Sequence, residues 1–153
     1  MKTIWLRVGL LTWLGLASVI PASDAAAQHT QAELVAEVES IAPGQTFRVG
    51  LRLRMDSHWH TYWTNPGDAG LATSMEWELP EGFEAWPFAW PAPEWLEVGG
   101  LVSFAYEEEV LLPMVFQAPA ELVPGTEVEL RGKASWLECK EMCLPGSASL
   151  AIT

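Results

Sequence analysis

The clearest pattern in the chain is an alternation of apolar and polar positions between residues 47 and 55. Phe47, Val49, Leu51, Leu53 and Met55 alternate with a glycine and three arginines. Side chains on a β-strand point alternately to its two faces, so a period of two predicts a strand with one buried and one exposed face.

A second alternating segment precedes this strand. Leu34, Ala36 and Val38 alternate with glutamates, and the sequence Ala-Pro-Gly-Gln at residues 42–45 supplies turn residues before the next strand. Residues 33–55 are therefore predicted to form a β-hairpin.

Turn signals recur every 8 to 15 residues along the rest of the chain, and no window has helical spacing of apolar residues over three turns without Pro or Gly. This pattern is typical of an all-β antiparallel β-sandwich with about seven to nine strands. The final alternation is still running at Thr153, as expected for one module of a longer protein or a fragment. Further strands are predicted over residues 58–63, 74–79, 83–90, 110–116, 126–137 and 148–152.

Composition adds that the chain is globular and does not bind nucleic acid. Hydrophobic residues make up 50% of the 153 positions and charged residues 18%, which suits a single domain with a packed core. The net charge is −12, and no cluster of Lys or Arg is present to replace the counterions of a phosphate backbone.

Residues 1–27 are typical of a secretory signal peptide. Lys2 and Arg7 precede an uncharged run from Val8 to Ile20, and small residues follow up to Ala27. The run is too short to cross about 30 Å of hydrocarbon as a helix. Cleavage is predicted after Ala27, which leaves residues 28–153 as one β-sandwich domain.

Export changes both the charge and the chemistry expected of this domain. Loss of Lys2, Arg7 and Asp24 with the signal peptide takes the net charge from −12 to −13. Outside the cytosol two cysteines can persist as a disulfide, so export makes Cys139 and Cys143 the main candidates for chemistry.

Three residues separate Cys139 from Cys143, and Lys140 is one of them. Closing a loop this short removes only about 2 kcal/mol of unfolded-state entropy, against roughly 4 to 5 kcal/mol for a loop near 100 residues. A structural staple here would be weak, whereas a close pair beside a cationic side chain suits thiol exchange. Redox exchange, a structural disulfide and metal ligation all remain open from the residues alone.

His58 and His60 raise the metal alternative. Residues i and i+2 of a strand share a face, so two imidazoles and two thiolates can make a four-ligand site for zinc or copper(I). The competing interpretation is that both histidines bond backbone carbonyls or pack against the neighbouring tryptophans.

Seven of the nine tryptophans follow residue 27. If these tryptophans are exposed, they form a binding face. The protein would then be a non-catalytic interaction domain, and its cysteines would form a structural disulfide. The phase of Trp77 and Trp136 within predicted strands favours core packing for these two.

Four segments of the chain resemble the N-terminal periplasmic domain of the DsbD and ScsB family of thiol:disulfide interchange proteins, and the ScsB branch more than DsbD itself. The resemblance covers nearly all of the chain after the signal peptide. The segments are His-Trp-His-Thr-Tyr-Trp-Thr-Asn-Pro-Gly-Asp (58–68), Trp-Pro-Ala-Pro-Glu (90–94), Tyr-Glu-Glu-Glu-Val-Leu-Leu-Pro (106–113) and Ala-Ser-Trp-Leu-Glu-Cys-Lys-Glu-Met-Cys-Leu-Pro (134–145).

The resemblance implies an immunoglobulin-like sandwich in which Cys139 and Cys143 are the redox pair. This pair would receive electrons from a thioredoxin-like domain, itself supplied by a membrane-embedded domain, and pass them to oxidised periplasmic proteins through a mixed disulfide. No cofactor other than the redox-active disulfide is expected. A Cys143→Ala variant is expected to trap the mixed disulfide.

This chain departs from the DsbD type, which has more than three residues between its cysteines. That type also shields the pair with an aromatic residue on a cap loop; the matching region here is residues 92–104, with Trp95 and Phe104 as candidate caps. Residues 58–62 fall where the DsbD type has tyrosines near its cysteines, so His58 or His60 is expected to assist proton transfer.

Overall fold

The computed structural model describes residues 28–153, so the predicted signal peptide lies outside the described residues. Within that range the chain forms ten strands and no helix. The strands are β1 Thr30–Ala36, β2 Thr46–Met55, β3 His60–Gly67, β4 Ser74–Glu78, β5 Glu84–Ala85, β6 Glu94–Val98, β7 Leu101–Glu107, β8 Glu109–Gln117, β9 Leu130–Cys139 and β10 Cys143–Ile152.

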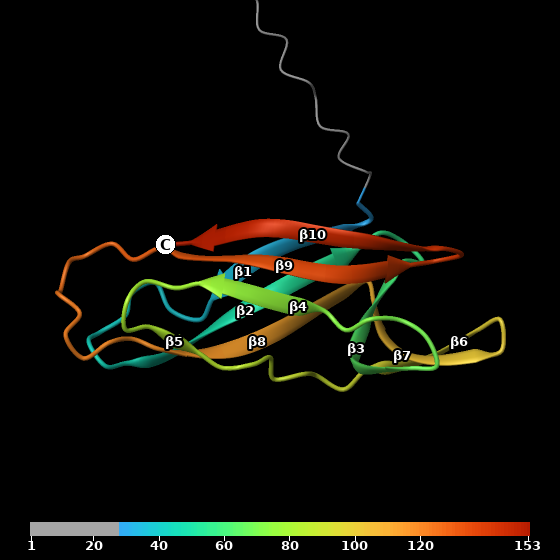
Figure 1. Ribbon diagram of the computed structural model, residues 1–153, viewed down its shortest axis with the longest axis horizontal. Coiled ribbons are helices and arrows are strands. Elements are labelled where there is room, and N and C mark those ends of the chain that lie inside the picture. Colours follow the sequence, from blue (N-terminus) through green and yellow to red (C-terminus); the bar gives the residue numbers. More distant parts are fainter. Residues whose placement is uncertain (1–27) are drawn as a thin grey trace, which may run out of the picture.

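The strands build two packed antiparallel sheets, which confirms the immunoglobulin-like β-sandwich (Figure 1). One sheet has the order β1-β2-β8-β5. The other has the order β10-β9-β3-β7-β6, with β4 pairing against β9 outside that path. Strand β10 is therefore an edge strand, and β9 lies between it and the rest of its sheet.

The core follows the alternation in the sequence. In β2, Leu51 and Leu53 are fully buried and Phe47 nearly so, while Arg48 and Arg54 are exposed. Strands β1 and β2 pair antiparallel with Leu34 opposite Leu51, as the predicted hairpin requires. The apolar side chains of β2 face the second sheet, whose Trp136 belongs to the same core cluster.

The segment at residues 83–90 departs from the prediction. Only Glu84–Ala85 pairs as a strand with β8. Pro87 and the prolines that follow it lack the N–H that a continuous ladder needs. The segment instead reaches β8 through separate bonds, from Trp86 N to Val115 O at 2.9 Å and from Ala89 N to Pro113 O at 2.8 Å.

The hairpin of β6 and β7 was not predicted. Its turn is Gly99-Gly100, and both glycines have positive φ, 63° and 83°, as a tight two-residue hairpin turn requires. This hairpin lies at the same end of the molecule as the connection between β9 and β10, away from the C-terminus (Figure 1).

Three strand boundaries differ from prediction at positions that matter for the site, and one of them is the start of β10 at Cys143, five residues before the predicted start at residue 148. Strand β3 begins at His60 and not at His58, because His58 lies in the preceding turn with φ of 67°. Strand β9 begins only at Leu130 but continues to Cys139, two residues past the predicted end. As a result, the first residue of β3, His60, and the last residue of β9, Cys139, are register partners.

Candidate functional site

The two cysteines close the hairpin of β9 and β10. Cys139 is the last residue of β9, Cys143 is the first residue of β10, and the two are direct cross-strand partners. They form a disulfide with their Cα atoms 4.1 Å apart. The three-residue loop between them is held by a hydrogen bond from Lys140 N to Met142 O of 3.1 Å, and Lys140 is exposed.

The two halves of the disulfide are in different surroundings. Cys139 is only 2% exposed and packs in a small apolar cluster, whereas Cys143 is exposed on the edge strand. An incoming thiolate therefore reaches the Cys143 side of the bond. The cluster around Cys139 consists of Tyr62 and Ala105 with Leu96 and Leu137 at its margin.

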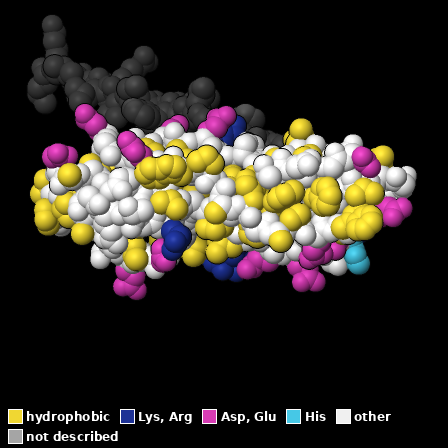
Figure 2. All heavy atoms as spheres, turned by 90° about the horizontal axis from the view of Figure 1, so that it is seen from below, with side chains coloured by type: hydrophobic (Ala, Val, Ile, Leu, Met, Phe, Trp, Pro, Cys, Tyr) yellow, Lys and Arg dark blue, Asp and Glu magenta, His cyan; other side chains and the backbone are white. Residues whose placement is uncertain are grey.

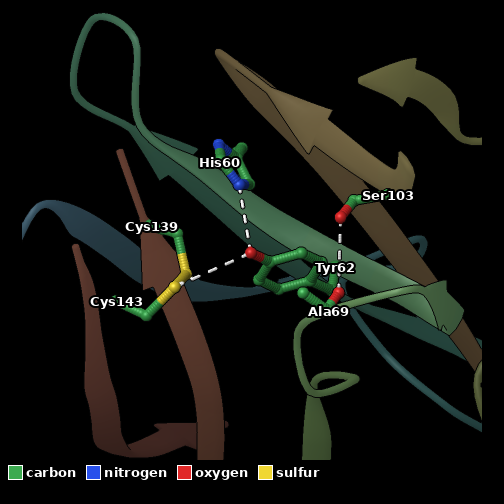
Figure 3. Close-up of a disulfide and its surroundings, with 6 residues drawn as sticks. All are labelled: His60, Tyr62, Ala69, Ser103, Cys139 and Cys143. Atoms are coloured by element: carbon green, nitrogen blue, oxygen red, sulfur yellow. Dashed lines mark hydrogen bonds between the residues drawn. A yellow bond between two sulfur atoms is a disulfide. The ribbon is translucent and has the colours of Figure 1, made fainter. Parts of the chain in front are cut away.

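Two polar side chains of β3 share a face with this disulfide (Figure 3). His60 Nε2 lies 3.2 Å from the Tyr62 hydroxyl, and that hydroxyl lies 3.8 Å from Cys143 Sγ. A disulfide sulfur carries no proton, so in the contact with Cys143 only the hydroxyl can donate. When it does, the hydroxyl oxygen accepts a hydrogen bond from His60 Nε2–H, in the tautomer of the imidazole that carries its proton on Nε2.

Burial shifts the pKa values of both groups. Desolvation lowers the pKa of His60 below its usual 6.5, and the nearby Glu107 carboxylate opposes part of that change. Desolvation raises the pKa of Tyr62 above its usual 10.0. At neutral pH the imidazole is therefore neutral and the phenol keeps its proton, as the hydrogen-bond chain requires.

A glycine covers the ring of Tyr62. Gly70 has φ of 112°, and a Cβ at this position would overlap with carbons of the Tyr62 ring. The covering segment is held to β7, because Asp68 N donates to Val102 O at 2.8 Å and Val102 N donates to Asp68 Oδ2 at 2.9 Å. Residues 65–67, whose Asn-Pro-Gly sequence is typical of a turn, are instead the end of β3, and together with Asp68 they position a wall of the site.

Glu138 anchors β9 from the opposite face, immediately before Cys139. Its side chain is 1% exposed and points into the sandwich. The carboxylate accepts hydrogen bonds from His29 N at 2.9 Å and from Trp136 Nε1 at 3.1 Å. Both carboxylate oxygens are thereby satisfied, which is what holds a buried carboxylate in an apolar core.

The structure separates the two histidines that the sequence placed on one face. His60 is buried and reaches Tyr62, whereas His58 lies in the exposed turn before β3. Because His58 has a left-handed conformation and precedes β3, the alternation of side chains along the strand does not extend to it, and the two imidazoles do not share a face. Within residues 28–153 no group of three or more His, Cys, Asp or Glu side chains is arranged to hold a metal ion.

The candidate caps lie on the wrong face to cover the disulfide. Trp95 pairs with Phe104 across β6 and β7, and Phe104 meets Trp63 edge-on with ring centroids 6.2 Å apart. The neighbour of Trp95, Leu96, packs against the cluster that contains Cys139. Because neighbouring strand positions face opposite sides, Trp95 points away from the disulfide, and its side chain is 69% exposed.

Tyr62 is the site residue that sequence reasoning overlooked, together with the glycine that covers it. The signal was present, since Tyr62 is two residues after His60 and a strand places such residues on one face. No comparable signal marked Gly70, because its role depends on the long-range approach of its backbone to the ring. Of the tryptophans, Trp136 is buried and Trp77 packs edge-on against Phe116 with centroids 5.0 Å apart, which confirms both as core residues.

An immunoglobulin-like sandwich with one exposed and one buried cysteine, bonded across the tip of an edge hairpin, is arranged for thiol–disulfide exchange. The sequence model for the family described as "Thiol:disulfide interchange protein DsbD, N-terminal" matches residues 26–153. The chain therefore belongs to the DsbD N-terminal family, whose general activity is thiol–disulfide interchange.

A solved structure of a distant protein, ScsB, shows the same fold. The N-terminal periplasmic domain of ScsB from Proteus mirabilis is 22% identical with a TM-score of 0.62, over 87% of this chain and 48% of that one. The reduced DsbD N-terminal domain from Neisseria meningitidis is 14% identical with a TM-score of 0.45, over 80% of this chain and 83% of that one. This chain thus spans about half the length of the ScsB structure.

No curated protein is similar enough in sequence to count as a match to this chain. No helix long and apolar enough to cross a membrane occurs within residues 28–153.

Proposed function

We propose that this domain is a periplasmic electron relay that acts through the Cys139–Cys143 pair. It receives electrons from a thioredoxin-like domain, which a transmembrane electron-transfer domain supplies, and passes them to oxidised periplasmic proteins. Membership of the family supports the chemistry. The observation that carries the proposal is the contrast between exposed Cys143 and buried Cys139, because exchange needs one sulfur that a partner can reach.

The reduction of the domain proceeds in two exchanges. The partner's thiolate attacks Cys143 Sγ, the bond to Cys139 Sγ breaks, and Cys139 leaves as a thiolate that takes up a proton. The partner's second thiol loses its proton and attacks the mixed disulfide, which releases Cys143 as a thiolate. Two electrons have then passed to the domain, the partner holds a disulfide, and no cofactor besides the cysteine pair takes part.

The delivery of electrons runs the same steps in reverse. The Cys143 thiolate attacks the disulfide of an oxidised periplasmic protein, and a mixed disulfide forms. The thiolate of Cys139 then attacks Cys143 Sγ and closes the pair, so that the substrate leaves with both sulfurs reduced. Buried Cys139 resolves and does not need to meet the substrate itself.

This order reverses the trapping variant expected from the sequence. A Cys143→Ala variant keeps only the buried sulfur of Cys139, which a partner does not reach. Cys139→Ala keeps the exposed sulfur and removes the group that would resolve a mixed disulfide. The variant that traps a partner should therefore be Cys139→Ala.

In the test, each single-cysteine variant is mixed with a thioredoxin-like domain that lacks its own resolving cysteine. The remaining cysteine of that domain carries 2-nitro-5-thiobenzoate as a mixed disulfide. Non-reducing electrophoresis should show a covalent complex with Cys139→Ala and little or none with Cys143→Ala. Failure of both variants to form a complex would refute the relay. An equal yield from both would refute the assignment of Cys143 while leaving exchange intact.

Redox titration against glutathione tests the same proposal without a partner. A cycling pair should have a reduction potential between about −280 and −180 mV. A value well below about −300 mV is that of an inert structural bridge and would contradict the relay.

The proposed location rests on residues 1–27, which we propose are removed as a signal peptide with residues 28–153 retained as the domain. Expression of the whole chain in a Gram-negative host should yield a periplasmic protein that begins at Gln28. Intact-protein mass spectrometry of the periplasmic fraction measures this, and recovery of the uncut chain from the cytosol would contradict it.

A further inference from the structure

The hydrogen-bond chain from β3 to the disulfide ends on one of the two sulfurs. We propose that Tyr62 is a catalytic residue of the exchange: in the reduced protein its hydroxyl donates its hydrogen bond to the thiolate of Cys143, and His60 is the positioning residue that directs it there. The inference rests on the proposed function for its role in turnover. The hydrogen bond itself is a property of the reduced domain and needs no partner protein.

The contact between the hydroxyl and the sulfur is in place before the disulfide opens. Tyr62 has one hydroxyl proton, and its hydroxyl oxygen lies 3.8 Å from Cys143 Sγ, which can only accept. In the disulfide that sulfur is a weak, neutral acceptor. Once the pair is fully reduced and Cys143 has been released as a thiolate, its Sγ carries a full negative charge, and the same contact becomes a charge-assisted hydrogen bond of roughly twice the strength. The hydroxyl thus favours the thiolate over both the thiol and the disulfide.

The surroundings of the second sulfur work in the opposite direction. Cys139 is 2% exposed and lies beside Ala105, Leu96 and Leu137. An apolar environment disfavours a thiolate relative to a thiol. Of the two sulfurs, Cys143 is therefore the one that both faces solvent and has a hydroxyl donor, and this contrast identifies it as the nucleophile.

His60 prevents the hydroxyl from turning elsewhere. Its Nε2–H donates to the phenol oxygen across 3.2 Å, and that contact points the single hydroxyl proton toward the sulfur. Gly70 lies against the ring and prevents the phenol from swinging out of the site. No proton leaves Tyr62 in this step; the thiol proton of Cys143 passes to solvent, and the phenol remains neutral.

Other ionisable groups near the site are few and differ in exposure. Glu107 on β7 is the register partner of His60, and Glu94 on β6 pairs with Ala105. Lys140 and Glu141 are exposed in the loop between the cysteines. These groups are unchanged in the variants below, so their influence on Cys143 cancels in the comparison.

The experiment measures the reactivity of Cys143 as a function of pH. The whole domain carrying Cys139→Ala is reduced, and its alkylation by iodoacetamide is followed between pH 5 and 10. Adding Tyr62→Phe should lower the rate at pH 7 about tenfold, the effect of one pKa unit, and should move the pH midpoint upward. The rate at high pH, where every molecule is already a thiolate, should be almost unchanged.

The chain offers a matched control in Tyr106. This tyrosine is also buried, but its hydroxyl donates to Pro91 O at 2.8 Å and not to the disulfide. Tyr106→Phe should leave the alkylation profile where it was. An equal profile for Tyr62→Phe and Tyr106→Phe would overturn the proposal.

His60 variants separate positioning from packing. His60→Gln keeps an N–H donor near the Nε2 position and should retain most of the effect, whereas His60→Leu removes the donor and should raise the midpoint as Tyr62→Phe does. Identical profiles for these two variants would overturn the role of His60, and they remain decisive if Tyr62→Phe does not fold. Alkylation needs no partner protein, so its result is independent of the trapping experiment. If Tyr62→Phe changed the alkylation profile but neither single-cysteine variant trapped a partner, the relay would be refuted and this inference would stand.

Discussion

Gly70 is a position where the site has no room for a side chain. Its φ of 112° is unfavourable for any residue with a Cβ, and that Cβ would overlap with the ring of Tyr62. We expect Gly70→Ala to lower the free energy of unfolding by about 1–3 kcal/mol and to displace the phenol from Cys143. Chemical denaturation measures the first effect and the alkylation profile of Cys143 the second.

Gly99 provides the control for Gly70. It also has a positive φ, 63°, but a Cβ there would meet nothing within 4 Å. Gly99→Ala therefore measures backbone strain without a collision, at a cost of about 1–2 kcal/mol, and should leave Cys143 unaffected. If both variants shifted the alkylation profile equally, contact with Tyr62 would not be the cause.

The pKa of His60 predicts a pH dependence of stability. Burial lowers this pKa in the folded protein, so the folded state binds fewer protons than the unfolded state between the two pKa values. The contribution of the neutral imidazole to the free energy of unfolding is therefore fully present above the pKa of the unfolded state, about 6.5. This contribution is lost as the pH falls below that value towards the lower pKa of the folded state.

His60→Gln removes this titration. We therefore expect the difference in free energy of unfolding between the native protein and His60→Gln to shift against the native protein as the pH is lowered from 7 to 5. Urea denaturation at several pH values measures it. A difference that does not change with pH would contradict the neutral, buried imidazole.

Single residues show where sequence reasoning succeeds and where it stops. The cysteine pair, its exposed Lys140 and the core positions of Trp77 and Trp136 follow from spacing and phase. His58 could not be placed correctly, because a left-handed residue resets the alternation and leaves no mark in composition. Trp95 was expected in a cap loop, but it lies on β6 next to Leu96, where a difference of one strand position moves a side chain to the other face.

At the scale of elements, predictability followed the strength of the alternation. β2 was predicted nearly to its ends because its arginines and apolar residues alternate without a break. The hairpin of β6 and β7 was missed although Gly99-Gly100 is a strong turn signal, since the glutamates and exposed apolar residues of β6 give no clear period. Its exposed side chains include Trp95, Val98 and Leu101.

The hairpin of β9 and β10 predicts a small effect of reduction on stability. The disulfide closes a loop of five residues at a point where the strands already pair, and β10 remains in register with β9 from Cys143 to Ile152. We expect reduction to lower the free energy of unfolding by about 2 kcal/mol or less. Urea denaturation with and without dithiothreitol measures this, with the double variant Cys139→Ala/Cys143→Ala as the control for reductant effects.

A much larger loss of stability would favour the alternative in which the cysteines are a structural staple of an interaction domain. The double variant should then be as unstable as the reduced protein. An unstable reduced protein beside a stable double variant would instead point to repulsion or desolvation of thiolates within the site.

The whole molecule is strongly acidic, and this charge affects its rate of association with charged partners. Residues 28–153 retain only six of the eight basic residues, because Lys2 and Arg7 lie in residues 1–27. Figure 2 shows acidic side chains scattered over the face seen there, with few basic ones. Four arginines are already paired with glutamates, Arg48 with Glu37 among them. The field around the domain is therefore negative, and it favours positively charged partners.

Small charged disulfides test this field. The reduced domain should react faster with cystamine, a cation, as the ionic strength is lowered from 0.5 to 0.02 M, whereas dithiodipropionate, an anion, should react more slowly. Stopped-flow measurement of thiol loss gives both rates. A salt dependence of the same sign for both reagents would show that the net charge does not act at Cys143.

The register of Cys139 and Cys143 has a consequence for the speed of a redox cycle. Because the ladder of β9 and β10 already places the two Cα atoms 4.1 Å apart, the backbone does not need to travel when the sulfurs separate or rejoin. The reorganisation energy of each half-cycle then falls on two side-chain torsions and on the hydrogen bond from Tyr62. In the proposed relay, this would leave the rate of collision with partners as the limit, and one surface around Cys143 would serve both the proposed donor and the proposed acceptor.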